Sequence, residues 1–121
     1  MNPDLSAHII QFVADNPLLD GRSWHGWDGT LAYRLGLAPA VPKVSDYADL
    51  EPLNPDPRTA PAGALHHFDV APYGHTVIDV YGGGGTVLEA TSAGLQYRFL
   101  AEVIRTSRGV YLGWTYHREE N

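Results

Sequence analysis

Apolar residues recur at helical spacing at the start of the chain. Ile9, Phe12 and Val13 lie three or four positions apart within residues 3–16, which places them on one face of an α-helix. Pro17 closes this pattern, because the residue before a proline is pushed out of the helical region of backbone space. The pattern therefore predicts a first helix over residues 3–16, with its apolar stripe turned toward a core.

A second, shorter helix is predicted over residues 28–37. Asp28 is a residue type that caps helix N-termini, and Leu31 and Leu35 recur four positions apart, so both are expected to point inward. Gly36 is a typical helix stop, because glycine readily adopts the left-handed conformation in which many helices end.

Prolines gather in the middle of the chain. Six of the nine fall within residues 38–62, so this stretch is predicted to be loop, with one helical turn at residues 45–50. A loop of this length is uncommon in a compact domain. It is expected to be either a functional flap or a tether that crosses one face of the protein.

The second half of the chain has the short apolar runs of β-strands, bounded by glycine or serine. The runs are residues 63–70, 75–81, 86–92, 97–105 and 110–118. Four glycines at 82–85 predict a hairpin between two of them. The fourth run also fits a helix, with Leu100, Val103 and Ile104 in phase. This order predicts an α+β fold with N-terminal helices packed on an antiparallel β-sheet meander.

Length and charge narrow the range of functions. The chain has 121 residues, which corresponds to a single domain over residues 1–121. Its formal net charge of −6 argues against broad nucleic-acid binding, which needs a basic face. The chain contains no apolar run near the roughly 20 residues of a membrane span, and its first residues lack a secretory signal pattern. We therefore expect synthesis in the cytoplasm, no nucleic-acid partner and no membrane span.

His75 and Glu89 lie fourteen positions apart, on either side of the glycine run. This spacing resembles two members of a catalytic triad. The two residues fall on neighbouring predicted strands but are not directly opposed, so a bulge or a longer loop is needed to bring them into contact. A histidine at the start of a strand is equally typical of a polar edge position.

The order of motifs resembles the CHAP and NlpC/P60 families of cysteine peptidases and amidases. A tryptophan-containing helix and a proline-rich loop are followed by "PAGALHHFD", "GHTVIDVYGGGGTVLEAT" and "YLGWTYHR". The resemblance implies a papain-like core that cuts peptide or amide bonds in bacterial peptidoglycan. It places His75 at the catalytic histidine, Glu89 at the third member of the triad and Asp28 at the cysteine nucleophile. A shift by one residue would place Gly29 there instead.

Neither of these residues is a thiol, and the chain has no cysteine at all. Disulfides, thiol catalysis and zinc–thiolate sites are therefore excluded. Loss of the nucleophile removes most of the catalysis, on the order of a millionfold in a well-studied triad. Asp28 is a poor substitute, because its attack on an amide would form an anhydride. Thr30 is the alternative nucleophile if the helix turns its hydroxyl toward His75.

Aromatic residues surround these positions in the sequence. Trp24, Trp27 and Tyr73 are predicted to line a ligand-binding cleft, where they would stack on sugar rings or a peptide. The alternative is that the tryptophans are core residues. On that interpretation Trp27 and Trp114 are expected in the core, and Trp24 is expected to be the more exposed.

No metal site and no cofactor are predicted. Asp28, His75 and Glu89 together would be a chemically reasonable ligand set, but they lack the close spacing of metal motifs. His66 and His67 are adjacent in a strand, so they point to opposite faces and cannot easily chelate one ion. One of this pair is expected to be exposed and the other half-buried.

Three functions remain open. The first is a catalytically degenerate peptidoglycan-hydrolase-like domain, kept as a binding or structural module in a bacteriophage virion, a phage tail or a cell-wall accessory. Its partners would be peptidoglycan or other virion proteins. The second is an active peptidoglycan amidase or endopeptidase that uses Thr30, or the pair of Asp28 and His75, instead of cysteine. The third is an immunity-like or inhibitor-like module that binds a partner through its acidic surface. The missing thiol favours the first.

Overall fold

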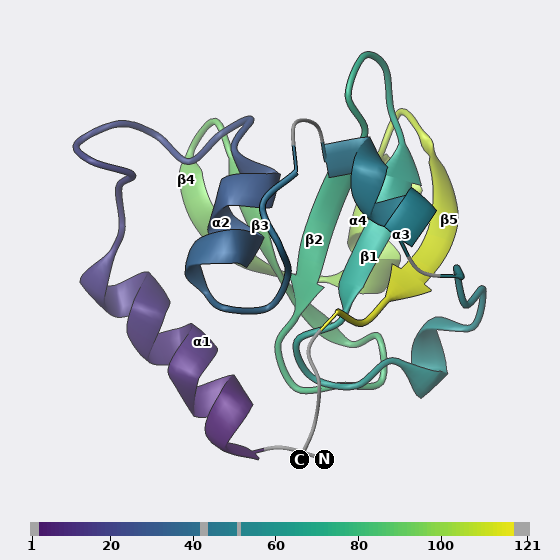
Figure 1. The fold of residues 1–121 in the computed structure, drawn as a ribbon, viewed down its shortest axis with the longest axis horizontal. Coiled ribbons are helices and arrows are strands. Elements are labelled where there is room, and N and C mark those ends of the chain that lie inside the picture. Colours follow the sequence, from purple (N-terminus) through teal and green to yellow (C-terminus); the bar gives the residue numbers. More distant parts are fainter. Residues whose placement is uncertain (1–2, 42–43, 51, 118–121) are drawn as a thin grey trace.

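The computed structural model describes residues 3–41, 44–50 and 52–117 of the chain. The helices are α1 (Pro3–Asp15), α2 (Asp28–Arg34), the 3₁₀ turn η1 (Val44–Asp46), α3 (Tyr47–Leu50), the 3₁₀ turn η2 (Pro57–Thr59) and α4 (Leu100–Thr106). The strands are β1 (Leu65–Asp69), β2 (His75–Asp79), β3 (Thr86–Thr91), β4 (Gly94–Phe99) and β5 (Val110–Thr115). Figure 1 shows their arrangement.

The predicted α+β class is confirmed. The five strands form one sheet in the order β4-β3-β2-β1-β5, and every pair is antiparallel. Strands β1 to β4 follow one another as the predicted meander, but β5 does not extend it. It pairs with β1 at the opposite edge of the sheet, and α4 lies in the connection that leads there.

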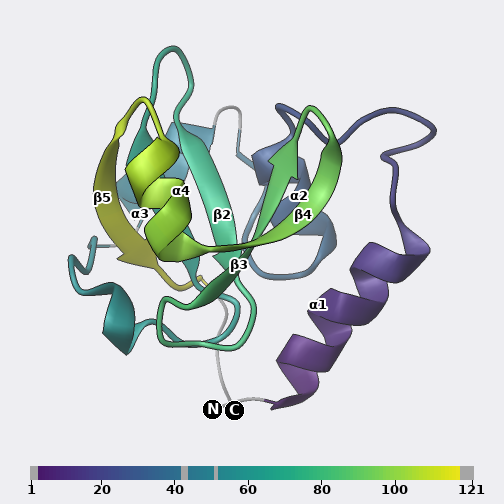
Figure 2. The ribbon, with the colours of Figure 1, turned by 180° about the vertical axis from the view of Figure 1, so that it is seen from behind.

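Two hydrophobic clusters lie on the two faces of the sheet. Figure 1 shows α2 and α3 in front of the sheet and α1 to one side next to α2, and Figure 2 shows α4 against the opposite face. The larger cluster joins the first two helices to the sheet through Leu5, Ile9, Trp24, Leu31, Ala32, Leu35, Leu65, Ile78, Val80, Leu88 and Ala90. The smaller cluster joins α4 to the sheet through Phe68, Val77, Val87, Leu100 and Val103.

The run at residues 97–105 belongs to two elements. Strand β4 ends at Phe99 and α4 begins at Leu100, so neither the strand nor the helix prediction covers the whole run. Leu100 and Val103 are buried against the sheet, as the helical phase predicts. The packing of these two side chains on β2 and β3 turns the chain into a helix after it leaves the sheet edge.

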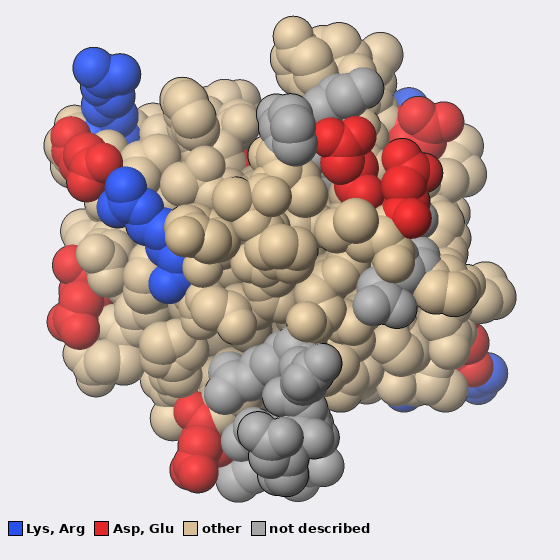
Figure 3. Space-filling model, in the orientation of Figure 1, with Lys and Arg blue, Asp and Glu red and all other residues tan. Residues whose placement is uncertain are grey.

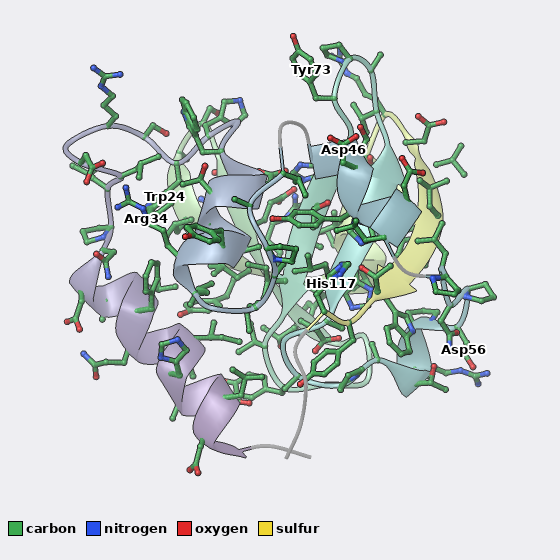
Figure 4. All side chains as sticks on the ribbon, in the orientation of Figure 1. Trp24, Arg34, Asp46, Asp56, Tyr73 and His117 are labelled. Atoms are coloured by element: carbon green, nitrogen blue, oxygen red, sulfur yellow. The ribbon has the colours of Figure 1, made fainter. Side chains whose placement is uncertain are left out.

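The expected burial of the tryptophans is wrong. Trp24 is 1% exposed and lies in the larger cluster, with its ring 6.1 Å from that of Phe12 and its Nε1–H donating to the Asn16 carbonyl. Figure 4 shows Trp24 directed inward beside α2. Trp27 is 50% exposed, and Trp114 is only partly buried. The indole of Trp24 fills the space between α1 and α2. The residue spacing in the loop that carries Trp24 does not indicate this burial.

The proline-rich segment is a tether across the sheet face, as one of the two predictions for it proposed. Tyr47 is fully buried, and its hydroxyl donates to the Pro39 carbonyl at 2.7 Å. Asn54 forms backbone hydrogen bonds in both directions with Trp114 of β5. The predicted helical turn at 45–50 is present as η1 and α3.

A buried carboxylate organises the glycine hairpin between β2 and β3. Asp79 is fully buried and accepts hydrogen bonds from the backbone N–H groups of Gly82 and Gly84, at 2.6 and 3.0 Å. Its Oδ2 also lies 2.8 Å from Nε2 of His66, which is fully buried as well.

Among the described residues, no helix is long and apolar enough to cross a membrane.

The hairpin gives a matched test of backbone requirements. Gly84 has φ of +67°, and a Cβ there would approach the Pro57 carbonyl to 2.6 Å, whereas a Cβ at Gly85 meets nothing within 4 Å. Gly84→Ala is expected to lower the free energy of unfolding by about 2–4 kcal/mol, from left-handed strain plus overpacking. The midpoint temperature of thermal unfolding, Tm, should then fall by on the order of 10 °C. Gly85→Ala should change little, and equal losses in both variants would contradict this account.

Candidate functional site

The three residues aligned with the catalytic triad meet at one end of the sheet. Nδ1 of His75 lies 2.9 Å from Oδ2 of Asp28, and Nε2 of the same ring lies 2.7 Å from Oε2 of Glu89. The two carboxylates therefore engage both nitrogens of one imidazole. Asp28 and Glu89 are 8% and 7% exposed, so both charges lie largely out of water.

The local backbone explains how Asp28 reaches β2. The N-cap of α2 is Trp27, not the predicted Asp28, which is the first residue of the helix. No side chain caps this helix, and the Asp28 carboxylate instead accepts a hydrogen bond from the Thr76 backbone N–H at 3.0 Å. This contact anchors the start of α2 to the start of β2.

The register of the sheet explains how Glu89 reaches His75. The pairs between β2 and β3 are Ile78 with Leu88 and Asp79 with Val87. Continuing that register would place Glu89 opposite Val77, two residues beyond His75 on the same face. The described pairing stops before this point, so the imidazole bridges the two strands diagonally where they are no longer paired.

The charged contacts continue through Arg98, a residue that the sequence reasoning missed. Its Nη1 donates to Oε1 of Glu89 at 2.6 Å, and its Nη2 donates to Oε1 of Glu102 at 2.8 Å. The side chains of Asp28, His75, Glu89, Arg98 and Glu102 thus form one chain of alternating charge from α2 through the sheet to α4. The four-residue spacing of Arg98 and Glu102 is a helical signal, but Arg98 lies in β4 and Glu102 in α4, so the contact crosses the junction of the two elements.

His75 is protonated at neutral pH in this setting. Burial alone would lower its pKa, but the hydrogen bonds and charges of Asp28 and Glu89 outweigh burial and raise the pKa to about 9. Burial raises the pKa of Glu89, but His75 and Arg98 outweigh that effect and hold its pKa below the usual range. Both ring N–H groups of His75 therefore donate to carboxylates, and the ring has no free lone pair.

A cavity of about 580 Å³ opens beside this cluster. It is lined by His25, Gly26, Trp27, Asp28, Gly29, Thr30, Val41, Val70, Pro72, Tyr73, Gly74, His75, Ala90, Ser107 and Arg108. A second cavity, of about 300 Å³, shares Val70, Pro72, Gly74 and His75 with it. The β1–β2 loop therefore lies between two hollows.

Two of the three predicted ligand-binding aromatics line the larger cavity. Trp27 and Tyr73 are 50% and 62% exposed, and Figure 4 shows Tyr73 at the tip of the β1–β2 loop. Trp24 does not line it, because its side chain is buried between α1 and α2. Trp24 is therefore a core residue and cannot contact a ligand there.

Thr30 also lines the cavity, but it is not paired with His75. Both nitrogens of that ring are held by Asp28 and Glu89, so the ring does not accept a proton from the Thr30 hydroxyl. In the described structure, His75 therefore does not activate the Thr30 hydroxyl.

The adjacent pair His66 and His67 points to opposite faces, as predicted, but both side chains are buried, which corrects the expected exposure. His67 contacts the hydroxyls of Thr76 and Thr115 at 2.9 and 2.7 Å. Burial, with smaller effects from His117 and His66, lowers the pKa of His67 to about 3, so this ring is neutral. Within the described part of the chain, no three His, Asp or Glu side chains are arranged to hold a metal ion.

Comparison with known proteins adds no assignment. No protein-family model matches the chain, and no curated protein and no solved structure is significantly similar to it. The resemblance to the CHAP and NlpC/P60 families therefore rests on the motifs alone, and a papain-like core stays a prediction.

The elevated pKa of His75 predicts a pH-dependent stability. The folded value of about 9 exceeds the ordinary 6.5, so the folded state binds the proton more tightly. The resulting stabilisation, on the order of 1–3 kcal/mol, is complete below pH 6.5 and is lost as the pH rises through 9. His75→Gln should therefore lower the free energy of unfolding more at pH 6 than at pH 10, measured by urea denaturation.

The matched control is His25→Gln, because the His25 side chain is exposed. This variant is expected to change stability little at either pH. An equal loss for His75→Gln at pH 6 and pH 10 would contradict a protonated His75.

Proposed function

We propose that this protein is a catalytically inactive, peptidoglycan-hydrolase-like domain that binds cell-wall material in the cavity beside Asp28. The observation that carries the proposal is the saturated imidazole. A triad histidine has to exchange a proton with the nucleophile. His75 instead donates both N–H groups to carboxylates and has a pKa of about 9.

The position of Asp28 supports the same proposal. In a cysteine hydrolase a thiolate pairs with a protonated histidine, and the thiolate then attacks the substrate. Here a carboxylate at the start of α2 pairs with the protonated His75, so the charge pattern remains and the reactive sulfur is absent. This substitution keeps the charge balance of the cleft while it removes the nucleophile.

Binding to the cell wall would place the protein in a cell-wall accessory or in a phage virion. The cavity walls support this use, because Trp27 and Tyr73 offer exposed aromatic faces on which sugars or peptides stack. The competing proposal of an active hydrolase needs a group that can accept a proton at neutral pH. Neither Thr30 nor the ring of His75 meets that need in the described geometry.

Co-sedimentation with purified peptidoglycan sacculi tests this proposal. The native protein is expected to sediment with sacculi without dissolving them. Trp27→Ala should weaken binding by about fivefold or more, since an exposed tryptophan in a cavity is a common binding hot spot. Tyr81→Ala is the matched control, because Tyr81 is 54% exposed and does not line the cavity. Failure of the native protein to sediment would contradict binding. Clearing of sacculi that disappears in His75→Ala would contradict inactivity.

The lost nucleophile can be probed by Asp28→Cys. The chain has no other cysteine, so alkylation reports on this one thiol. The protonated His75 beside it should lower the thiol pKa and raise its reaction rate with iodoacetamide at pH 6 by roughly tenfold or more over Ser23→Cys on the exposed loop. Equal rates in the two variants would count against a thiolate position at residue 28.

A further inference from the structure

One oxygen of the Asp28 carboxylate takes no part in holding the fold together. Its Oδ2 accepts both described hydrogen bonds, from the His75 ring and from the Thr76 backbone. Oδ1 has no hydrogen-bond partner among the described residues. Since no fully buried polar side-chain atom among them lacks a partner, Oδ1 keeps some contact with solvent.

Asp28 lines the larger cavity, although its side chain is only 8% exposed. A carboxylate that is more than nine-tenths buried gains a strong preference for a hydrogen-bonded, positively charged partner, because its remaining oxygen is poorly hydrated. The cavity therefore presents one fixed acceptor with negative charge.

The walls of the cavity suit a small cation. Trp27 and Tyr73 supply exposed aromatic rings, and a cation over such a ring is attracted by its negative face. Asp28, Glu89 and Glu102 are three carboxylates paired with two cationic side chains, His75 and Arg98, so the connected cluster has one negative charge in excess. Arg108 also lines the cavity, and its charge disfavours ligands that carry several positive groups.

We propose that this cavity binds a primary ammonium group, with Asp28 Oδ1 as its acceptor and the rings of Trp27 and Tyr73 beside it. The proposal deepens the function proposed above and rests on it for the cell-wall source of the ligand. The ammonium group can belong to the amino terminus of a peptide or to an amino sugar. In both, N-acetylation removes the charge and two of the three N–H donors.

Two matched pairs of probes test the requirement for an amine. The first pair is alanyl-alanine amide and its N-acetyl form, and the second is glucosamine and N-acetylglucosamine. Binding is followed in ¹H–¹⁵N spectra at the Trp27 indole and the backbone amides of Gly29 and Thr30. At least one free amine should bind with Kd of about 1–10 mM. Its N-acetyl form should bind at least tenfold more weakly, and the pair that binds identifies the source.

Matched variants assign the effect to Asp28. Asp28→Asn keeps the shape but removes the charge, and amine binding should be lost. Asp20→Asn makes the same chemical change at an exposed carboxylate that pairs with Arg34 outside the cavity, and it should bind as the native protein does. Trp27→Ala should weaken amine binding by about fivefold without touching the His75 hydrogen bonds, so the test survives if Asp28→Asn fails to fold.

Three results would overturn the inference. They are equal binding of free and N-acetylated probes, equal losses in Asp28→Asn and Asp20→Asn, and no spectral change with either amine up to about 50 mM.

Sacculi acetylated with acetic anhydride separate this inference from the proposed function. If native and acetylated sacculi sediment the protein equally, only the ammonium inference fails. If the amine probes bind but sacculi do not, only the cell-wall proposal fails.

Discussion

A protonated imidazole between two carboxylates holds the candidate site of this protein together. His75 connects Asp28 on α2 with Glu89 on β3, and it does so where β2 and β3 are no longer paired. A buried charge is tolerated only when it is paired and hydrogen-bonded. In this cluster each side chain provides its neighbour with an opposite charge and a hydrogen bond. Two members of this cluster, Asp28 and His75, also line the larger cavity.

His67 and His75 show burial and carboxylate partners moving the pKa of an imidazole in opposite directions. His67 faces two threonine hydroxyls and lies near other imidazoles, and its pKa falls to about 3. His75 faces two carboxylates, and its pKa rises to about 9. His66 lies against the fully buried Asp79, which also binds the glycine turn of the β2–β3 hairpin. His67 fills the interior without charge, and His75 links three elements. His66 supports the turn through Asp79.

Charge on the surface is distributed differently from charge in the site. In the face that Figure 3 shows, acidic and basic side chains lie mainly toward the rim, and uncharged residues occupy the centre. Two of the acidic residues, Asp20 and Asp56, form ion pairs with Arg34 and Arg58. Such exposed pairs contribute little to stability and are weakened further by salt. The formal net charge of −6 already counts these arginines, so the acidic surface expected of an immunity-like module stays a prediction.

Local pattern predicted the elements better than it predicted their packing. The spacing of Ile9 and Leu31 located α1 and α2, and the motifs brought Asp28, His75 and Glu89 to attention before any contact among them was visible. Burial of Trp24 was misjudged, because it depends on the gap between two helices and not on neighbours in sequence. Arg98 was missed for a similar reason. Its role arises from the pairing of β4 with β3, and a single sequence does not specify that register.

Replacing a nucleophile by a carboxylate changes what a cleft can do without changing its charge. A thiolate and a carboxylate both stabilise the protonated histidine, but a carboxylate has two acceptor oxygens instead of one sulfur. In this protein one oxygen of Asp28 satisfies the fold, through the His75 ring and the Thr76 backbone. The other has no hydrogen-bond partner among the described residues. Under the proposed function, a carboxylate at this position would leave the imidazole without a reaction partner and would give the cleft a fixed anionic acceptor, so loss of catalysis and gain of recognition would follow from one change in chemistry.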